Sequence, residues 1–247
     1  MRGVSGDGTV RTLWRTAESW GYVTHDPFAG VLLPEVIKSE PRCFTLEETL
    51  RILENAKKPY KTFYWLAAET GMRAGELCAL RWQDIDLDHR VVRVRQSSWN
   101  GHVQAPKTAA GRRTFAISLQ LTEHLRDMKS DRSGLVFMNK LGRPLRGSKV
   151  VEKHLGPLLE TLGISHRGLH AFRHLNGSLM DQFGVPIKVR TERLGHSTAT
   201  MTLDGYTHSI GEDDRRIANE LGRILCPLVP NSNAETGRLQ STGFANQ

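Results

Sequence analysis

Apolar residues recur at helical spacing over much of this chain, and this spacing predicts a mainly helical fold. Residues 10–20 carry apolar positions three and four apart, and Gly21 and Pro27 end that pattern. A second amphipathic run opens with Thr45 and Glu48, a capping-box pattern that marks a helix start. Further helices are predicted over residues 61–71, 73–82, 121–130, 148–162, 169–183, 186–194 and 211–224.

Alternation of apolar and polar residues occurs in the middle of the chain. Residues 91–96, 102–106 and 113–118 indicate three short strands, and Asn100-Gly101 is a two-residue hairpin turn between the first two. The expected class is therefore mainly α with a small three-stranded antiparallel sheet, an α+β fold.

The two ends of the chain differ in composition from its middle. Residues 29–42 contain glycine and prolines in the manner of a linker, and residues 227–247 are polar and predicted to be a disordered tail. We therefore expect one helix and a linker over 1–38, a large domain over 39–226 and a tail over 227–247.

A formal charge of +8 and a pI near 9.7 suggest a polyanionic partner, either nucleic acid or an anionic membrane surface. No apolar run is long enough to span a bilayer and the first residues lack an apolar signal core, so we expect a cytoplasmic protein. The three cysteines are far apart and outside any CxxC pair, as in a reducing compartment. Because metal-cluster and phosphate-loop motifs are missing, we expect no metal and no cofactor.

Two motifs place a guanidinium beside a second polar group. Arg73 follows "TGM" at a predicted helix start, and Glu76 lies three residues on, where it could orient Arg73. In "LHAFRHL", His170 and Arg173 bring a titratable imidazole beside a fork suited to phosphate oxygens. Taken alone, the first motif could be an ordinary surface ion pair and the second a basic helix face that lies on a DNA backbone.

Lys107 and Tyr206 are two further candidates. Lys107 lies in the turn before the last strand, where it could donate a proton if neighbouring cations or burial lower its pKa; a solvated lysine is the alternative. Tyr206 lies between His196 and His208 and is either a packed tyrosine or a nucleophile. A tyrosine of pKa near 10 is a poor nucleophile at neutral pH, so the second interpretation requires nearby cations and a base.

In their combination and order, these motifs resemble the catalytic domain of the tyrosine recombinases, the family of phage and transposon integrases. The successive blocks are "TGMRAGEL", "PKTAAGRRT", "HAFRH" and "LGHSTATMTLDGYTH", and the resemblance extends over most of the chain. It implies the catalytic-domain fold of that family and an enzyme that cuts and rejoins DNA strands without metal or ATP.

The resemblance also implies a role for each candidate. Tyr206 would attack the scissile phosphate, form a 3′-phosphotyrosyl link and release a 5′-hydroxyl. Arg73 and Arg173 would hold the non-bridging oxygens and stabilise charge in the transition state. Lys107 would protonate the leaving oxygen, and His170 would assist proton transfer at the tyrosine. Two further residues would support these groups: His196, by a hydrogen bond to the phosphate, and Glu76, through Arg73.

Double-stranded DNA is thus the expected partner. A basic stretch leads into the predicted helix 148–162 and suggests a groove-contacting element, although a solvated basic helix is an equal alternative. The DNA-binding candidates are Arg143, Arg146, Lys149 and Lys153. In this family the helix after the nucleophile often docks on a neighbouring protomer, and the amphipathic residues 211–225 suggest a homotetramer formed in this way.

The front of the chain departs from the family pattern. Integrases usually carry a helical core-binding domain ahead of the catalytic one, and residues 1–38 resemble only its last helix and linker. We therefore expect a truncated chain, and the alternative function is a remnant that binds DNA or a full-length partner without completing recombination. A plain basic DNA-binding protein with a structural Tyr206 is disfavoured, because binding alone does not require the complete set of candidates.

Two smaller departures lie within predicted helices. Asn176 and Gly177 stand where the family commonly has a small hydroxyl residue. The segment "VRTERLGH", residues 189–196, carries more charge ahead of its Leu-Gly-His turn than the family pattern leads us to expect.

Overall fold

The computed structural model describes residues 5–27, 43–105, 112–128, 133–195 and 212–226. The chain divides into two compact units, Met1–Glu40 and Pro41–Gln247. Among its described residues, 5–27, the first unit contains helix α1 (Ser5–Ser19), whose start precedes the predicted one. In this unit the Trp14 indole donates to the carbonyl of His25 over 2.9 Å, which ties the segment after the helix back to it.

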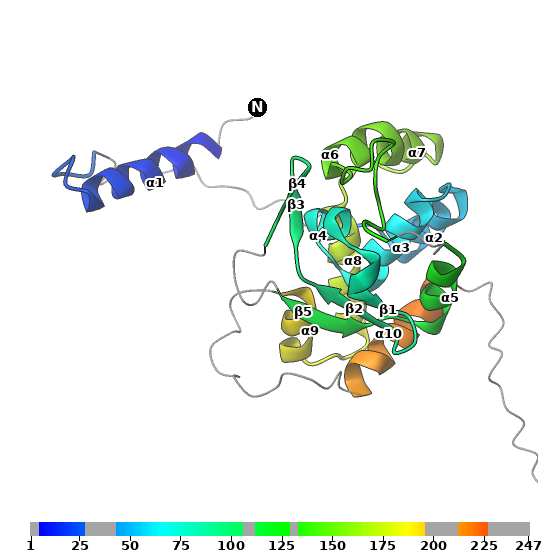
Figure 1. Ribbon diagram of the computed structural model, residues 1–247. Helices are drawn as coiled ribbons and strands as arrows, with labels where there is room; N and C mark the ends of the chain where they lie inside the picture. The colour runs from blue at the N-terminus through cyan, green and yellow to red at the C-terminus, as the bar shows by residue number, and fades with distance from the viewer. Residues whose placement is uncertain (1–4, 28–42, 106–111, 129–132, 196–211, 227–247) are drawn as a thin grey trace, which may run out of the picture. The chain divides into compact units, whose positions relative to one another are not determined.

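The second unit is mainly helical. Its helices are α2 (Leu46–Asn55), α3 (Tyr60–Thr70), α4 (Ala74–Ala79), α5 (Leu119–Met128), α6 (Gly147–Val150), α7 (Gly156–Thr161), α8 (His170–Gln182), α9 (Ile187–Leu194) and α10 (Glu212–Leu225) (Figure 1). A π-helical turn, Val151–Leu155, joins α6 to α7, so the predicted helix 148–162 is one nearly continuous element. A short 3₁₀ helix, Trp82–Asp84, precedes the sheet.

A three-stranded antiparallel sheet is present, as predicted, but its strands differ from those expected. Its order is β1 (Ile85–Asp86), β2 (Val91–Val94) and β5 (Arg113–Ala116), with Val92 opposite both Ile85 and Phe115. The predicted strand 102–106 is instead β4 (His102–Gln104), which pairs with β3 (Ser97–Trp99) in a separate hairpin. That hairpin turns at Asn100-Gly101, as predicted, and both residues have positive φ.

Helix α3 lies at the centre of the core. Every residue from Thr62 to Thr70 is buried, because α2, α4, α5, α8 and α10 all pack against this helix. Tyr64 stacks on Phe172 of α8, with ring centroids 5.6 Å apart. A helix that is covered on all sides explains why its sequence is apolar without a polar stripe.

Asn176 fixes α8 against the end of α3. Its buried amide nitrogen donates to the carbonyls of Ala68 and Glu69, at 2.9 and 2.8 Å. These carbonyls belong to the last turn of α3, where backbone acceptors lack helical partners. In this chain an amide therefore binds the α3 terminus at the position where a small hydroxyl residue was expected.

The apolar face of α10 lies against the chain's own core. Ile217, Leu221 and Leu225 are buried, and α10 packs on α2, α3, α5 and β5. We predicted that this face docks on a neighbouring protomer; within this chain the face is covered by those elements, and docking on a second copy stays a prediction. No helix among the described residues is long and apolar enough to cross a membrane.

Candidate active site

Arg73 and Glu76 form the first part of the site. Gly71 ends α3 in the left-handed conformation, and Arg73 follows as the N-cap of α4. The Arg73 backbone N–H donates to Glu76 Oε2 over 2.8 Å, and its Nη1 donates to Glu76 Oε1 over 3.1 Å. Glu76 is buried whereas the Arg73 side chain is 43% exposed, so the carboxylate orients a guanidinium that reaches the surface.

A second arginine, Arg113 at the start of β5, was missed in the sequence. Its Nη1 and Nη2 donate to the two oxygens of Glu76 at 2.9 and 2.8 Å, and both side chains are 6% exposed. Burial raises the pKa of Glu76, but hydrogen bonds and charge from Arg113 and Arg73 outweigh burial and hold that pKa below its ordinary value. Glu76 therefore stays ionised between two cations.

The last turn of α9 gathers three arginines. The Arg193 carbonyl accepts from Arg113 Nε at 2.8 Å, the Leu194 carbonyl from Arg173 Nη2 at 2.5 Å, and the Gly195 carbonyl from Arg73 Nη2 at 2.9 Å. Carbonyls at a helix C-terminus lack helical partners and carry partial negative charge, which favours cations. Three consecutive backbone groups thus hold the arginine cluster, which we define as Arg73, Arg113 and Arg173.

Arg173 is the most enclosed catalytic candidate among the described residues. It is 4% exposed, and its Nη1 donates to the carbonyl of Gly71 over 2.7 Å. Burial, together with the charges of Arg73 and Arg113, lowers its pKa to about 10. Because Glu76 is the carboxylate that hydrogen-bonds the arginine cluster in the described part of the chain, the cluster carries excess positive charge and would be stabilised by an anion.

His170 begins α8 and is exposed. Its ring lies edge-on to that of His174, with centroids 4.7 Å apart. Since Arg173 is buried on the same helix, α8 presents an imidazole at the surface and a guanidinium in the interior. His170 and Arg173 thus lie three residues apart on α8, but only His170 is exposed.

Three predicted site residues lie outside the described residues: Lys107, His196 and Tyr206. Their flanking residues are described. Lys107 belongs to the segment between β4 and β5, and β5 begins with Arg113. His196 directly follows Gly195, and Tyr206 belongs to the segment between α9 and α10.

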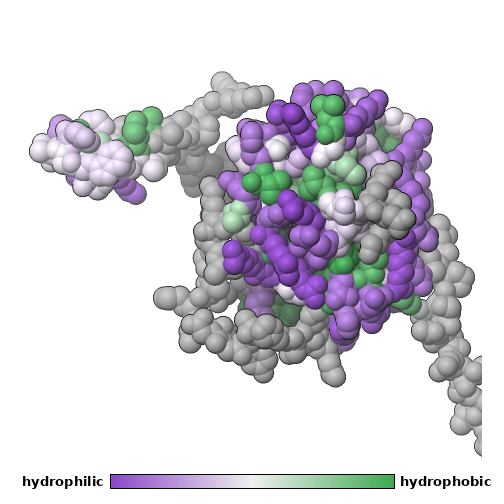
Figure 2. Space-filling model, viewed as in Figure 1, coloured by the Kyte–Doolittle hydropathy of each residue, from purple (hydrophilic) through white to green (hydrophobic). Residues whose placement is uncertain are grey.

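The four DNA-binding candidates all have exposed side chains. Arg146 is the N-cap of α6, and a Cβ added to Gly101 would lie 3.4 Å from its Nε, so the α6 start approaches the turn of the β3–β4 hairpin. Lys149 pairs with Glu152 at 2.7 Å, and both members of that pair are more than half exposed. Over the face shown in Figure 2, hydrophilic residues predominate on the second unit. Arg143 and Lys153 complete this exposed basic set.

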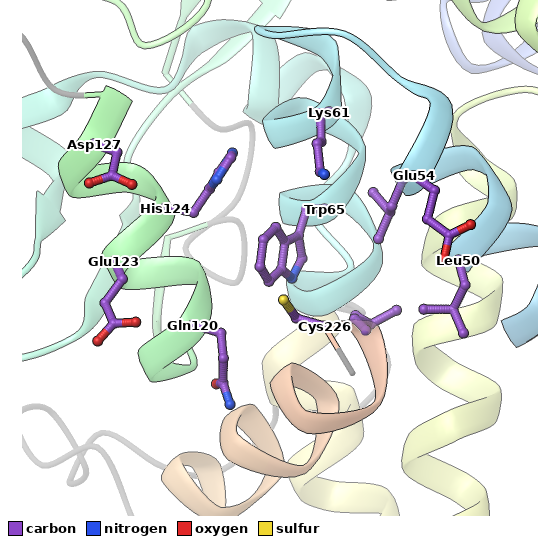
Figure 3. Close-up of a pocket in the computed structure, with 11 residues that line it drawn as sticks. Leu50, Glu54, Lys61, Trp65, Gln120, Glu123, His124, Asp127 and Cys226 are labelled. Carbon is purple, nitrogen blue, oxygen red and sulfur yellow. The ribbon is translucent and has the colours of Figure 1, made fainter. Parts of the chain in front are cut away.

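A pocket of about 270 Å³ lies elsewhere, between α2, α3, α5 and the end of α10 (Figure 3). Trp65 and Cys226 line it, and the carboxylates of Glu54, Glu123 and Asp127 lie at its edge. No residue of the arginine cluster lines this pocket. The three carboxylates outnumber the one lysine in the lining, Lys61, and so disfavour a phosphate ligand; the pocket is not the candidate site.

Replacing Gly71 by alanine is expected to destabilise the protein by about 2–4 kcal/mol. Gly71 has a φ of 63°, and an added Cβ would lie 2.6 Å from Leu194 Cδ2 and 2.8 Å from Asn176 Oδ1. Urea unfolding measures the change, with Gly163→Ala as control, since Gly163 has a φ of 65° but open space around it. Equal losses in the two variants would show that backbone conformation alone, and not close packing, requires Gly71.

A cluster of ordered guanidinium groups with excess positive charge suits phosphate oxygens, which arginine binds through paired hydrogen bonds. The pattern of the phage integrase family matches residues 42–212, and the chain belongs to that family. The family and the catalytic-domain fold predicted from the motifs are thus confirmed.

Individual relatives agree with this assignment. The chain is 29% identical to a XerC-like tyrosine recombinase of Caldanaerobacter subterraneus, over 87% of this chain and 64% of that protein. It is 32% identical to the putative prophage phiRv2 integrase of Mycobacterium tuberculosis, over 73% of this chain and 50% of that protein. The chain thus spans about half to two thirds of the length of these relatives.

Solved structures show the same fold. The Tn1549 transposon integrase in complex with a circular intermediate DNA aligns with a TM-score of 0.63 at 21% identity, over 83% of this chain and 74% of that chain. A lambda integrase dimer bound to a core site aligns with a TM-score of 0.54 at 25% identity, over 82% of this chain and 74% of that chain.

Proposed function

We propose that this protein is a site-specific DNA recombinase that cuts and rejoins strands through a 3′-phosphotyrosyl intermediate. The observation that carries the proposal is the arginine cluster on three consecutive α9 carbonyls, directly before His196. Its excess positive charge suits a phosphodiester whose charge grows in the transition state. Family membership supplies the reaction class.

Tyr206 is the proposed nucleophile. Its oxygen attacks the scissile phosphorus and forms a phosphotyrosyl ester, while the bond from phosphorus to the 5′-oxygen breaks. His170 assists removal of the tyrosine proton, and Lys107 gives a proton to the leaving 5′-oxygen. One phosphodiester replaces another, so the reaction needs neither metal nor nucleotide cofactor, and a 5′-hydroxyl can reverse it.

Arg73, Arg173 and His196 bind the phosphate oxygens in this proposal. Arg73 has the exposure needed to reach a substrate, and Glu76 orients it. Arg173 has two N–H groups fixed on carbonyls, which hold its remaining donors in place without a rearrangement during the reaction.

The other tyrosines support the choice of Tyr206. The chain has four tyrosines, and two of the described ones lie in the second unit. Tyr64 is fully buried in the core, and burial raises its pKa. Tyr60 stacks on His154 at 3.8 Å between ring centroids, and burial raises its pKa as well. Both phenols are thus poorer nucleophiles than an ordinary tyrosine.

DNA binding, assembly and location belong to the same proposal. The exposed residues Arg143, Arg146, Lys149 and Lys153 contact the DNA backbone beside the site. Four copies assemble on DNA, which accords with the lambda integrase tetramer solved on a Holliday junction. Because the apolar face of α10 is covered within this chain, a second copy would have to displace it or use another surface. The protein acts in the bacterial cytoplasm, at the nucleoid.

A covalent trapping assay tests the proposal. The purified chain is incubated with nicked duplexes from the ends of the DNA element that encodes it, and adducts are resolved on a denaturing gel. Cleavage releases the short piece of strand between the scissile phosphate and the nick, which carries the 5′-hydroxyl. Because this piece diffuses away, it cannot reverse the attack, and the phosphotyrosyl ester accumulates. We expect a band of protein linked to DNA; its absence with every duplex would contradict cleavage by this chain.

DNA affinity is expected to depend steeply on salt. Phosphate contacts release counterions, and about four such contacts give a slope of log K against log salt of about −3.6. Fluorescence anisotropy with a labelled duplex between 50 and 200 mM salt, a window of about fourfold, measures the slope. Replacement of Lys149 and Lys153 by alanine should remove about two contacts and so reduce the magnitude of the slope by about 1.8. A slope near zero in the unmodified chain would contradict backbone binding.

A further inference from the structure

Arg193 is a charged residue buried where α9 ends. Its side chain is 1% exposed, although it belongs to the charged segment that precedes the Leu-Gly-His turn. One guanidinium nitrogen, Nη2, donates to the carbonyls of Ala116 and Glu69, at 3.1 and 3.3 Å. The guanidinium also lies 5.3 Å from the ring centroid of Phe115. Arg193 thus connects α9 with β5 and with the end of α3.

Asp214 in the first turn of α10 completes this connection. Its carboxylate forms an ion pair with Arg193 Nη1 and accepts a hydrogen bond from the backbone N–H of Ala116. Ala116 therefore binds both partners, its carbonyl to Arg193 and its N–H to Asp214. The pair lies in the protein interior, where a charge that loses its partner lowers the free energy of unfolding.

The ion pair joins the two helices that flank the proposed nucleophile. Arg193 lies two residues before Gly195, and Asp214 lies eight residues after Tyr206 in the sequence. The same Arg193 residue uses its backbone carbonyl to hold Arg113, which in turn binds Glu76. One residue thus touches both the carboxylate that fixes α10 and the arginine cluster.

We propose that Arg193 and Asp214 are positioning residues, which hold the ends of the segment carrying His196 and Tyr206 at a fixed separation beside the arginine cluster. This inference rests on the proposed function, in which Tyr206 attacks a phosphate bound by that cluster. Closing a segment between two fixed helix ends restricts its conformations before the reaction, which lowers the entropic cost of placing the nucleophile.

An apolar replacement separates positioning from stability. Arg193→Leu leaves Asp214 without its cation, and Asp214→Leu leaves Arg193 buried without its anion, so each single variant is expected to be less stable. The double variant Arg193→Leu/Asp214→Leu leaves no buried charge unpaired and is expected to recover part of the stability; the rest is lost because backbone groups of Ala116 and Glu69 lose their partners. Arg216→Leu/Asp213→Leu is the matched control, because it removes an exposed ion pair from the same helix.

Two quantities are measured at a temperature below the unfolding transition of every variant. The first is the single-turnover rate of adduct formation at saturating nicked duplex, with the Kd measured in parallel. The second is amide hydrogen exchange over residues 196–211, compared with exchange in α7, because Arg193 itself binds the end of α3. In the double variant we expect about a tenfold lower rate, an unchanged Kd, and faster exchange over 196–211 and at the Ala116 amide, with exchange in α7 unchanged. The control pair should match the unmodified chain in both.

The outcomes distinguish this inference from the proposed function. Unchanged exchange over 196–211 in the double variant overturns positioning, whatever the adduct assay shows. Faster exchange with an unchanged rate also overturns it, because the reaction would not depend on the restraint. If the unmodified chain forms no adduct, the proposed function fails by itself, and the exchange comparison still decides whether the ion pair holds the segment.

Discussion

Tyr206→Phe is expected to abolish covalent attachment to DNA, by more than about 10⁴-fold, while the Kd for the same duplex changes by less than about twofold. Phenylalanine keeps the ring and removes only the oxygen that would attack phosphorus. The arginine cluster and the exposed basic residues, which supply the electrostatic part of binding, are unaffected. The measurement is adduct yield on nicked duplexes beside anisotropy titrations of the same preparations.

Tyr22→Phe is the matched control for this variant. Tyr22 is 79% exposed in the first unit and has no proposed part in the reaction. It should give the adduct yield of the unmodified chain. Retained attachment in Tyr206→Phe would remove Tyr206 as the nucleophile, and equal loss in both variants would point to a general effect of altered preparations.

Arg173→Lys is expected to slow adduct formation by about 10²–10³-fold, the usual cost of removing one transition-state donor. Arg173 bridges the carbonyls of Gly71 and Leu194 with two nitrogens of a planar guanidinium. A lysine has a single ammonium nitrogen and cannot reproduce this bridge and bind the phosphate in the same geometry. The positive charge remains, so the Kd should change by only a few-fold. Single-turnover rates at saturating duplex measure the effect.

Arg223→Lys is the control, since Arg223 is 68% exposed on α10 and pairs with Glu220 there. Its rate should equal that of the unmodified chain. A rate for Arg173→Lys within twofold of the unmodified chain would mean that Arg173 supports the fold and does not bind the phosphate.

Local signals in the sequence predicted much of the fold. The Thr45–Glu48 capping box forms at the start of α2, with both reciprocal hydrogen bonds, and α10 ends within one residue of its predicted end. These elements have strong signals that depend on neighbouring residues only. The strand pairing was harder to predict, because the alternation in residues 102–106 indicates a strand but does not show which strand it pairs with.

The arrangement of the site could not be predicted from the sequence, because it depends on contacts between residues far apart in the chain. The hydrogen bonds of Arg73, Arg113 and Arg173 to the end of α9 join residues 122, 80 and 21 positions apart. All three acceptors in these hydrogen bonds are backbone carbonyls, which have no signature in a motif. Arg113 had one usable signal: an arginine two residues before the buried Phe115 on a strand needs a buried anion.

The most direct test of the account identifies the residue that carries the DNA. The adduct from a nicked duplex is digested with nuclease and trypsin, and the modified peptide is sequenced by mass spectrometry. The account predicts a nucleotide on Tyr206, within the tryptic peptide 194–215. A nucleotide on another residue, or an adduct that persists in Tyr206→Phe, would contradict it.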